Sequence, residues 1–167
     1  IISDPQLLHH HTVLAQIGQD LGIIGCLEEA IHFQRKALSL KTNDNVYKLN
    51  LAATLSNAKN HTEALELIEQ VPEKFPRKYV IYGNILRKFK GPEAAAPYFE
   101  KAIQQEPDFY LPYANLIDCN QNYPESKRYW TERSFKKFPK NPEIVVNWIQ
   151  MQLGHSRYYD ELIEKNW

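Results

Sequence analysis

Small and apolar residues recur along the chain at helical spacing. In residues 91–107, Ala95, Phe99 and Ala102 follow one another at offsets of four and three, and Pro107 comes five residues later. Residues at these offsets lie on one face of a helix, and proline is common just past a helix end. The spacing therefore predicts an amphipathic helix that ends before Pro107.

The same spacing occurs at two earlier places, so it is a repeat. Its copies begin at Ala30, Ala64 and Ala95, which are 34 and 31 residues apart. A second series of apolar residues recurs at intervals of 34, 31, 34 and 32 residues, and each member stands in a segment rich in Leu, Ile, Tyr and Ala: Ile17, Leu51, Tyr82, Leu116 and Trp148. We expect these residues to be buried. A period of this length indicates stacked helix pairs.

The repeat resembles that of the tetratricopeptide repeat (TPR) family, whose unit is a helix pair of about 34 residues. The best copy fills the family's signature places with Tyr79, Tyr82, Gly83, Leu86, Ala95, Phe99, Ala102 and Pro107. The first copy departs from the pattern, with Gln34 where a large apolar residue is usual and Thr42 where proline is usual. The resemblance implies an all-α fold, a right-handed superhelical α-solenoid of antiparallel helix pairs.

The predicted organisation is a single TPR-like domain over residues 1–167. Its approximate repeats are 11–44, 45–75, 76–109, 110–141 and 142–167. In the fourth repeat Ser134 and Pro139 come two residues early, which predicts a shortened turn inside that repeat. In the fifth, residues 142–153 and 156–167 are expected to form a helix pair. Because the sequence begins at Ile1 and not at Met, we expect the chain to be part of a longer protein.

Composition excludes several classes of protein. Apolar residues make up 43% of the chain and charged residues 24%, as in ordinary globular proteins. Twenty basic residues balance twenty acidic ones, so no overall field attracts nucleic acid. No apolar run approaches the roughly 20 residues that a membrane span needs. Cys26 and Cys119 stand about three repeats apart, so we expect no disulfide and favour a cytoplasmic setting.

The sequence offers no candidate for catalysis, and we expect the chain not to be an enzyme. Nucleophile motifs and glycine-rich phosphate loops are absent. His9, His10 and His11 are consecutive, whereas metal ligands on one helix are spaced by three or four residues. We therefore predict neither a metal site nor a cofactor.

Amide side chains recur at the positions that the TPR resemblance assigns to the concave groove. In TPR proteins, the residue before each member of the second apolar series points inward. Four of the five such residues are carboxamides, namely Gln16, Asn50, Asn115 and Asn147. The exception is in the third repeat, where Asn84 stands near the expected position. An amide offers both a donor and an acceptor, so such a row can hold the main chain of an extended peptide. It partly resembles the asparagine row of the TPR arm of O-GlcNAc transferase.

Two basic residues of the third repeat, Arg77 and Lys88, are expected at the same groove. With neighbouring apolar side chains they suit a peptide that carries an acidic residue beside an apolar anchor. The alternative for all seven predicted site residues is a solvated surface, because exposed polar residues need no functional explanation.

The sequence thus favours a protein-interaction module that binds an extended peptide or a partner helix in its concave groove. The alternative is a regulatory or substrate-recruiting arm of a larger enzyme, such as a glycosyltransferase. The expected partner is a protein or peptide, neither a nucleic acid nor a membrane. Self-association through the terminal repeats is a further expectation, because Trp167 implies an apolar end face.

Overall fold

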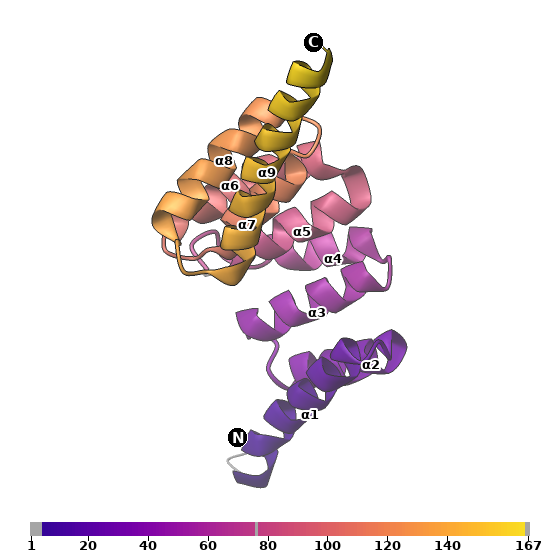
Figure 1. Ribbon diagram of the computed structural model, residues 1–167. Coiled ribbons are helices and arrows are strands. Elements are labelled where there is room, and N and C mark those ends of the chain that lie inside the picture. Colours follow the sequence, from indigo (N-terminus) through magenta and orange to yellow (C-terminus); the bar gives the residue numbers. More distant parts are fainter. Residues whose placement is uncertain (1–4, 76, 166–167) are drawn as a thin grey trace. The chain divides into compact units, whose positions relative to one another are not determined.

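A computed structural model describes the chain at residues 5–75 and 77–165, and its side chains at residues 10–75 and 77–154 (Figure 1). Within these residues the fold is all-α, as predicted, with no strand. Nine helices follow one another in the described part of the chain: α1 (Pro5–Ile23), α2 (Leu27–Leu40), α3 (Asn45–Asn57), α4 (His61–Glu69), α5 (Lys78–Lys90), α6 (Pro92–Gln105), α7 (Leu111–Cys119), α8 (Pro124–Lys137) and α9 (Pro142–Lys165).

Local sequence explains where several helices begin and end. Asp44 caps α3, because its carboxylate accepts hydrogen bonds from the N–H groups of Val46 at 2.9 Å and Tyr47 at 3.1 Å. Gly91 ends α5 with a φ of 97°, a conformation that favours glycine, and α6 begins at the next residue, Pro92. The ends of these helices are therefore set by an Asp cap, by a glycine with a positive φ and by a proline at the first helical position.

The chain divides into two compact units, residues 1–95 (unit 1) and residues 96–167 (unit 2), and the division falls within α6. In unit 1, each helix from α1 to α4 packs against the next one along the chain. α1 also contacts α3, and α3 contacts α5, so the first helices of successive pairs lie next to one another. This is the arrangement expected of stacked antiparallel helix pairs.

Unit 1 has an aliphatic core. Its buried cluster consists of Ile31, Leu49, Leu51, Ala52, Leu55, Ala64, Ile68, Val71 and Ile85. Ala30, Ala64 and Ala95 of the first repeated series are all fully buried. In the second series Leu51 is buried and Tyr82 is half-buried, but Ile17 is 37% exposed. The expectation that Ile17 is buried is wrong, because α1 contacts only α2 and α3 among the described helices, and this packing buries Leu14 but leaves Ile17 partly uncovered.

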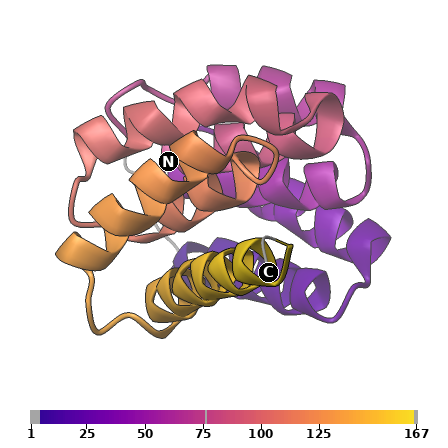
Figure 2. The same cartoon turned by 45° about the horizontal axis from the view of Figure 1, so that its top comes forward.

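The core of unit 2 combines aliphatic side chains such as Leu116, Ile117 and Ile144 with aromatic ones. Here α7, α8 and α9 pack against one another (Figure 1, Figure 2). The ring of Tyr113 meets those of Trp130 and Phe138 edge-on, with centroids 6.3 Å and 5.2 Å away. Phe135 stacks on Trp148 at 4.4 Å, which joins α8 to α9. Contacts between aromatic rings thus add to aliphatic packing in unit 2.

Two predictions about unit 2 need correction. The expected fifth helix pair is one continuous helix, α9, because only Gly154 and His155 lie between its halves and a single glycine costs a helix only about 1 kcal/mol. The fourth repeat is shortened in its first helix and not in its turn. α7 ends at Cys119, where Asn120 donates from its side chain to the Leu116 carbonyl at 2.7 Å, and four residues then lead to Pro124.

Candidate functional site

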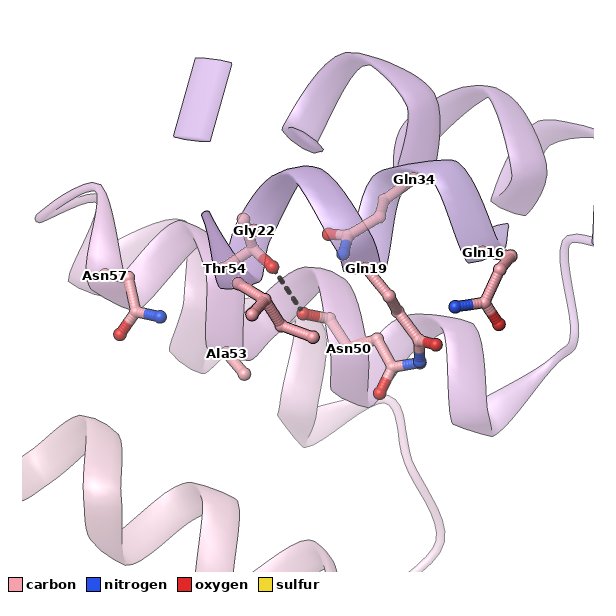
Figure 3. A pocket seen from close by; sticks show the side chains of 9 residues that line it. Gln16, Gln19, Gly22, Gln34, Asn50, Ala53, Thr54 and Asn57 are labelled. Carbon is pink, nitrogen blue, oxygen red and sulfur yellow. Dashed lines mark hydrogen bonds between the residues drawn. The ribbon is translucent and has the colours of Figure 1, made fainter. Parts of the chain in front are cut away.

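A cavity of about 410 Å³ lies in unit 1 among α1, α2 and α3 (Figure 3). Five of the side chains that line it are carboxamides: Gln16 and Gln19 from α1, Gln34 from α2, and Asn50 and Asn57 from α3. The other described lining residues are Gly22, Ile23, Ala53 and Thr54, so none is charged. We call this site the amide cavity.

Helical spacing brings these amides together. Gln16 and Gln19 are three residues apart on α1, and Asn50 and Asn57 are two turns apart on α3, so each pair lies on one helix face. The Thr54 hydroxyl donates to the Asn50 carbonyl at 3.0 Å, as the dashed line in Figure 3 marks. That bond uses the main chain of Asn50 and leaves its side-chain amide available.

Three of the five amides make no hydrogen bond with any described residue. Gln16 donates to the Asp20 carboxylate at 2.8 Å, and the Asn57 oxygen accepts from the Lys88 ammonium. In the described part of the chain, no such partner exists for the side chains of Gln19, Gln34 and Asn50. The half-buried side chains of Gln19 and Asn50 therefore present donors and acceptors to a ligand or to water, whereas Gln34 is buried.

Gln34 is the buried member of this group. Its side chain is only 4% exposed, and its Oε1 atom is buried without a partner among the described residues. The matching positions of the next two repeats, Ile68 and Phe99, are apolar and fully buried. A buried polar group that is left unpaired costs about 1–3 kcal/mol, so an amide at this position needs an explanation. From the sequence, Gln34 is a departure from the repeat and is not among the predicted site residues.

A close contact between α1 and α2 fixes the position of Gln34. A Cβ atom at Gly18 would lie 2.6 Å from Gln34 Cγ and 3.1 Å from the Ala30 carbonyl oxygen. Only glycine permits this approach. Asn57 was also missed by the sequence analysis, although its offset of seven residues from Asn50 was a signal that the two share a face.

A cation borders the amide cavity at its Asn57 end. Lys88 of α5 donates to the Asn57 side-chain oxygen. Burial lowers the pKa of the Lys88 ammonium below its usual value of 10.5, and the neighbouring charge of Arg87 lowers it further. No carboxylate contributes to this shift. Lys88, one of the predicted groove residues, thus contacts the amide cavity through Asn57.

The other predicted residues of unit 1 lie apart from the amide cavity lining. Arg77 is exposed and directly precedes α5, where its φ of 64° places it in the left-handed region. Asn84 is half-buried in α5, and its Oδ1 atom is buried without a partner among the described residues. Neither residue is among those that line the cavity.

Two predicted amides belong to unit 2. Asn115 lies in α7, is 6% exposed and has a buried Nδ2 atom that lacks a partner within the described residues. Asn147 is half-buried in α9, which packs against α7. A row of amides that continues from unit 1 through Asn115 and Asn147 stays a prediction.

Residues typical of metal sites do not gather within the described part of the chain. No group of three His, Cys, Asp or Glu side chains able to hold one ion occurs there. His10 is exposed, and His11 Nδ1 lies 2.8 Å from the Tyr47 hydroxyl, while the side chain of His9 falls outside the described residues. Cys26 and Cys119 are both free thiols. Among the described helices, none combines the length and the apolar character that crossing a membrane requires.

Solved structures share this architecture. PilF of Pseudomonas aeruginosa superposes with a TM-score of 0.74 at 19% identity, over 92% of this chain and 72% of that one. MamA of Desulfovibrio magneticus superposes with a TM-score of 0.64 at 16% identity, over 93% of this chain and 94% of that one. PilF and MamA are both TPR-repeat proteins. The chain has the TPR fold.

This TPR fold confirms the class predicted from the repeat. A further MamA structure superposes with a TM-score of 0.65 at 16% identity, over 79% of this chain and 80% of that one. No known sequence family and no curated protein sequence matches the chain. At such low identity the likeness establishes the fold alone, and the chemistry of the site has to be argued from the chain's own residues.

Proposed function

We propose that this chain is a protein-interaction module that does no catalysis, and that the amide cavity of unit 1 holds the main chain of an extended segment of a protein partner. The observation that carries the proposal is the cluster of three amides, Gln19, Gln34 and Asn50, whose hydrogen-bonding groups have no partner among the described residues. The TPR fold suits this class of function, because stacked helix pairs form extended concave binding surfaces.

An extended segment suits the amides better than a helix does. Each residue of an extended chain presents one N–H donor and one C=O acceptor, and these groups are unpaired until the chain binds. An amide side chain can accept from the first and donate to the second. A helix has most of these groups paired internally, so it would leave the amides of the cavity unsatisfied.

The size and lining of the amide cavity fit this use. Its volume of about 410 Å³ falls within the range of about 300–1,000 Å³ found for ligand pockets. Ala53 and Gly22 leave room beside the amides, so a main chain can approach closely. Because no lining residue is charged, the amide cavity itself selects for backbone and not for a charged side chain. Lys88 at its end adds a preference for an acidic residue there.

A peptide display selection against the folded chain tests the proposal. The wild type is compared with the double variant Gln19→Leu, Asn50→Leu, in which the side chains keep their approximate volume and lose their polar groups. Asn43→Leu is the matched control, because Asn43 is exposed and lies outside the amide cavity. Circular dichroism first establishes that the three proteins are equally helical.

The proposal predicts that the wild type and Asn43→Leu enrich the same extended peptides and that the double variant enriches none of them. Enrichment of the same peptides by all three proteins would place binding elsewhere on the chain. Enrichment by none would show that the amide cavity does not hold peptides.

A further inference from the structure

A second cavity, of about 610 Å³, lies wholly within unit 2. Three cationic side chains of α8 line it, namely Arg133, Lys136 and Lys137. Lys136 and Lys137 follow Arg133 by three and four residues, so all three project from one face of the last turns of the helix. No carboxylate is among the described residues that line the cavity. We call this site the cationic cavity.

The charges of the cationic cavity are only partly balanced by acidic side chains. Lys137 pairs with Asp108 at 2.8 Å, but the Asp108 side chain is 94% exposed, so water screens that pair. Lys136 has neither an ion pair nor a hydrogen bond with any described residue. Basic residues near a helix C-terminus interact favourably with the helix dipole, which accounts for some positive charge here. It does not account for Arg133 and Lys137, which repel each other at i and i+4.

Contacts with two aromatic residues orient Arg133. Its Nη1 atom donates to the Tyr129 hydroxyl at 2.8 Å, and its guanidinium lies 5.2 Å from the centre of the Trp130 ring. Trp130 is itself buried against Tyr113 in the core of unit 2. A guanidinium oriented in this way loses less conformational freedom on pairing with an anion than a mobile one does.

The rest of the lining is apolar or neutral. Ile103 and Tyr113 are buried and Pro107 is exposed, and the Tyr113 hydroxyl donates to the Pro107 carbonyl at 3.0 Å. Gln104 completes the set. The cationic cavity therefore joins a charged wall to an apolar one, a combination that fits a ligand with both characters.

We propose that the cationic cavity binds an acidic segment of a protein partner, with Asp or Glu carboxylates on Arg133, Lys136 and Lys137 and an apolar side chain against Ile103 and Pro107. A nucleic acid fits less well. The aromatic rings of Tyr113 and Trp130 are packed into the core, so they offer no exposed face on which bases could stack. This site is separate from the amide cavity, because every residue that lines it belongs to unit 2.

Fluorescence anisotropy tests this proposal on the full chain with a fluorescein-labelled peptide of alternating Glu and Leu. Peptides with Gln in place of Glu, and with Ser in place of Leu, separate the contributions of charge and apolar contact. Inorganic pyrophosphate and a single-stranded oligonucleotide are the competitors. Lys136→Glu is the principal variant, because this side chain has no described partner whose loss would unfold the protein. Lys140→Glu makes the same change of charge on an exposed residue outside the cavity.

We expect Lys136→Glu to weaken binding of the Glu–Leu peptide about tenfold, and Lys140→Glu to change it by less than about twofold. Asp108→Asn should strengthen binding, because it frees Lys137. Gln104→Trp should weaken binding without changing the charge, because it fills the cavity. The Gln19→Leu, Asn50→Leu variant should bind this peptide as the wild type does, so failure here leaves the proposed function of unit 1 intact.

Equal effects of Lys136→Glu and Lys140→Glu would overturn the proposal, because binding would then follow net charge and not the cavity. Equal affinity for the Glu–Leu and Glu–Ser peptides, or complete competition by pyrophosphate, would mean that the cavity binds a small anion and not a peptide. Tighter binding of the oligonucleotide than of the peptide would assign the cavity to nucleic acid.

Discussion

The two units use one architecture to build two different cavities. Unit 1 has an aliphatic core and a neutral cavity lined by amides, whereas unit 2 adds aromatic rings to aliphatic side chains in its core and has a cavity lined by cations. In unit 1 the difference begins with Gln34, which occupies a position that is apolar in the following two repeats. In unit 2 the cationic lining comes from one face of α8, which carries Arg133, Lys136 and Lys137. The repeat thus sets the helix packing, and a few substitutions within it set the chemistry of each unit.

The largest expected effect tests the aromatic contacts in the core of unit 2. Tyr113→Ala should lower the free energy of unfolding by about 3–5 kcal/mol, because Tyr113 is 2% exposed and contacts two other rings. Tyr113→Phe removes only the hydrogen bond to Pro107 and should cost about 0.5–1.5 kcal/mol. Urea unfolding followed by circular dichroism measures both. Equal losses for the two variants would show that the hydroxyl and not the ring packing stabilises unit 2.

A smaller effect tests the helix contact that positions Gln34 in unit 1. Gly18→Ala should destabilise the protein by about 1–3 kcal/mol, because its Cβ would overlap Gln34 and crowd the Ala30 carbonyl. Gly22→Ala is the matched control on the same helix. Its Cβ would lie 3.7 Å from Thr54 Oγ1, an ordinary contact, so it should be neutral or stabilising by up to about 1 kcal/mol. Thermal unfolding that ranks the two variants in the opposite order would contradict the packing described for α1 and α2.

The smallest effect compares one carboxylate from each unit. Burial alone would raise the pKa of Asp44, but hydrogen bonds from Lys41 and from the Tyr47 and Val46 N–H groups outweigh it and lower the pKa below 3.8. Asp44→Ala should therefore cost about 0.5–2 kcal/mol at neutral pH, through loss of the helix cap. Asp108→Ala should change stability too little to measure, because that carboxylate is almost fully exposed.

The pH dependence of Asp44 follows from the sign of this shift. A carboxyl group with a lowered pKa in the folded state contributes its full stability above the unfolded value of 3.8, and this contribution is lost as pH falls through the folded value. Urea unfolding at about pH 3 should show a smaller difference between the wild type and Asp44→Ala than at neutral pH. An unchanged difference would mean that the charge of Asp44 does not stabilise α3.

Much of the fold was predictable from spacing, because burial at repeat intervals requires small and apolar residues at fixed offsets. Ala30, Ala64 and Ala95 show this directly. The continuous α9 was not predictable in the same way. Both its halves are amphipathic, and whether a chain turns between two such segments depends on contacts that the local pattern does not contain.

The candidate sites were predictable only in part. Gln16 and Asn50 were expected on one surface, and both line the amide cavity. Gln34 comes from the second helix of its pair, so no rule about first helices would have included it. The cationic cavity depends on how α8 meets the segment around Pro107, and the sequence shows only a short basic stretch there. That these residues bind peptides stays a prediction.

One measurement tests most directly whether the amide cavity holds main chain. A peptide enriched by the wild-type protein is compared with versions in which single backbone N–H groups are replaced by N-methyl groups, using both the wild type and Asn50→Leu. The account predicts that methylation at one or two central positions weakens binding to the wild type about tenfold, and that Asn50→Leu largely abolishes this difference. Equal losses in both proteins, or no loss at any position, would contradict it.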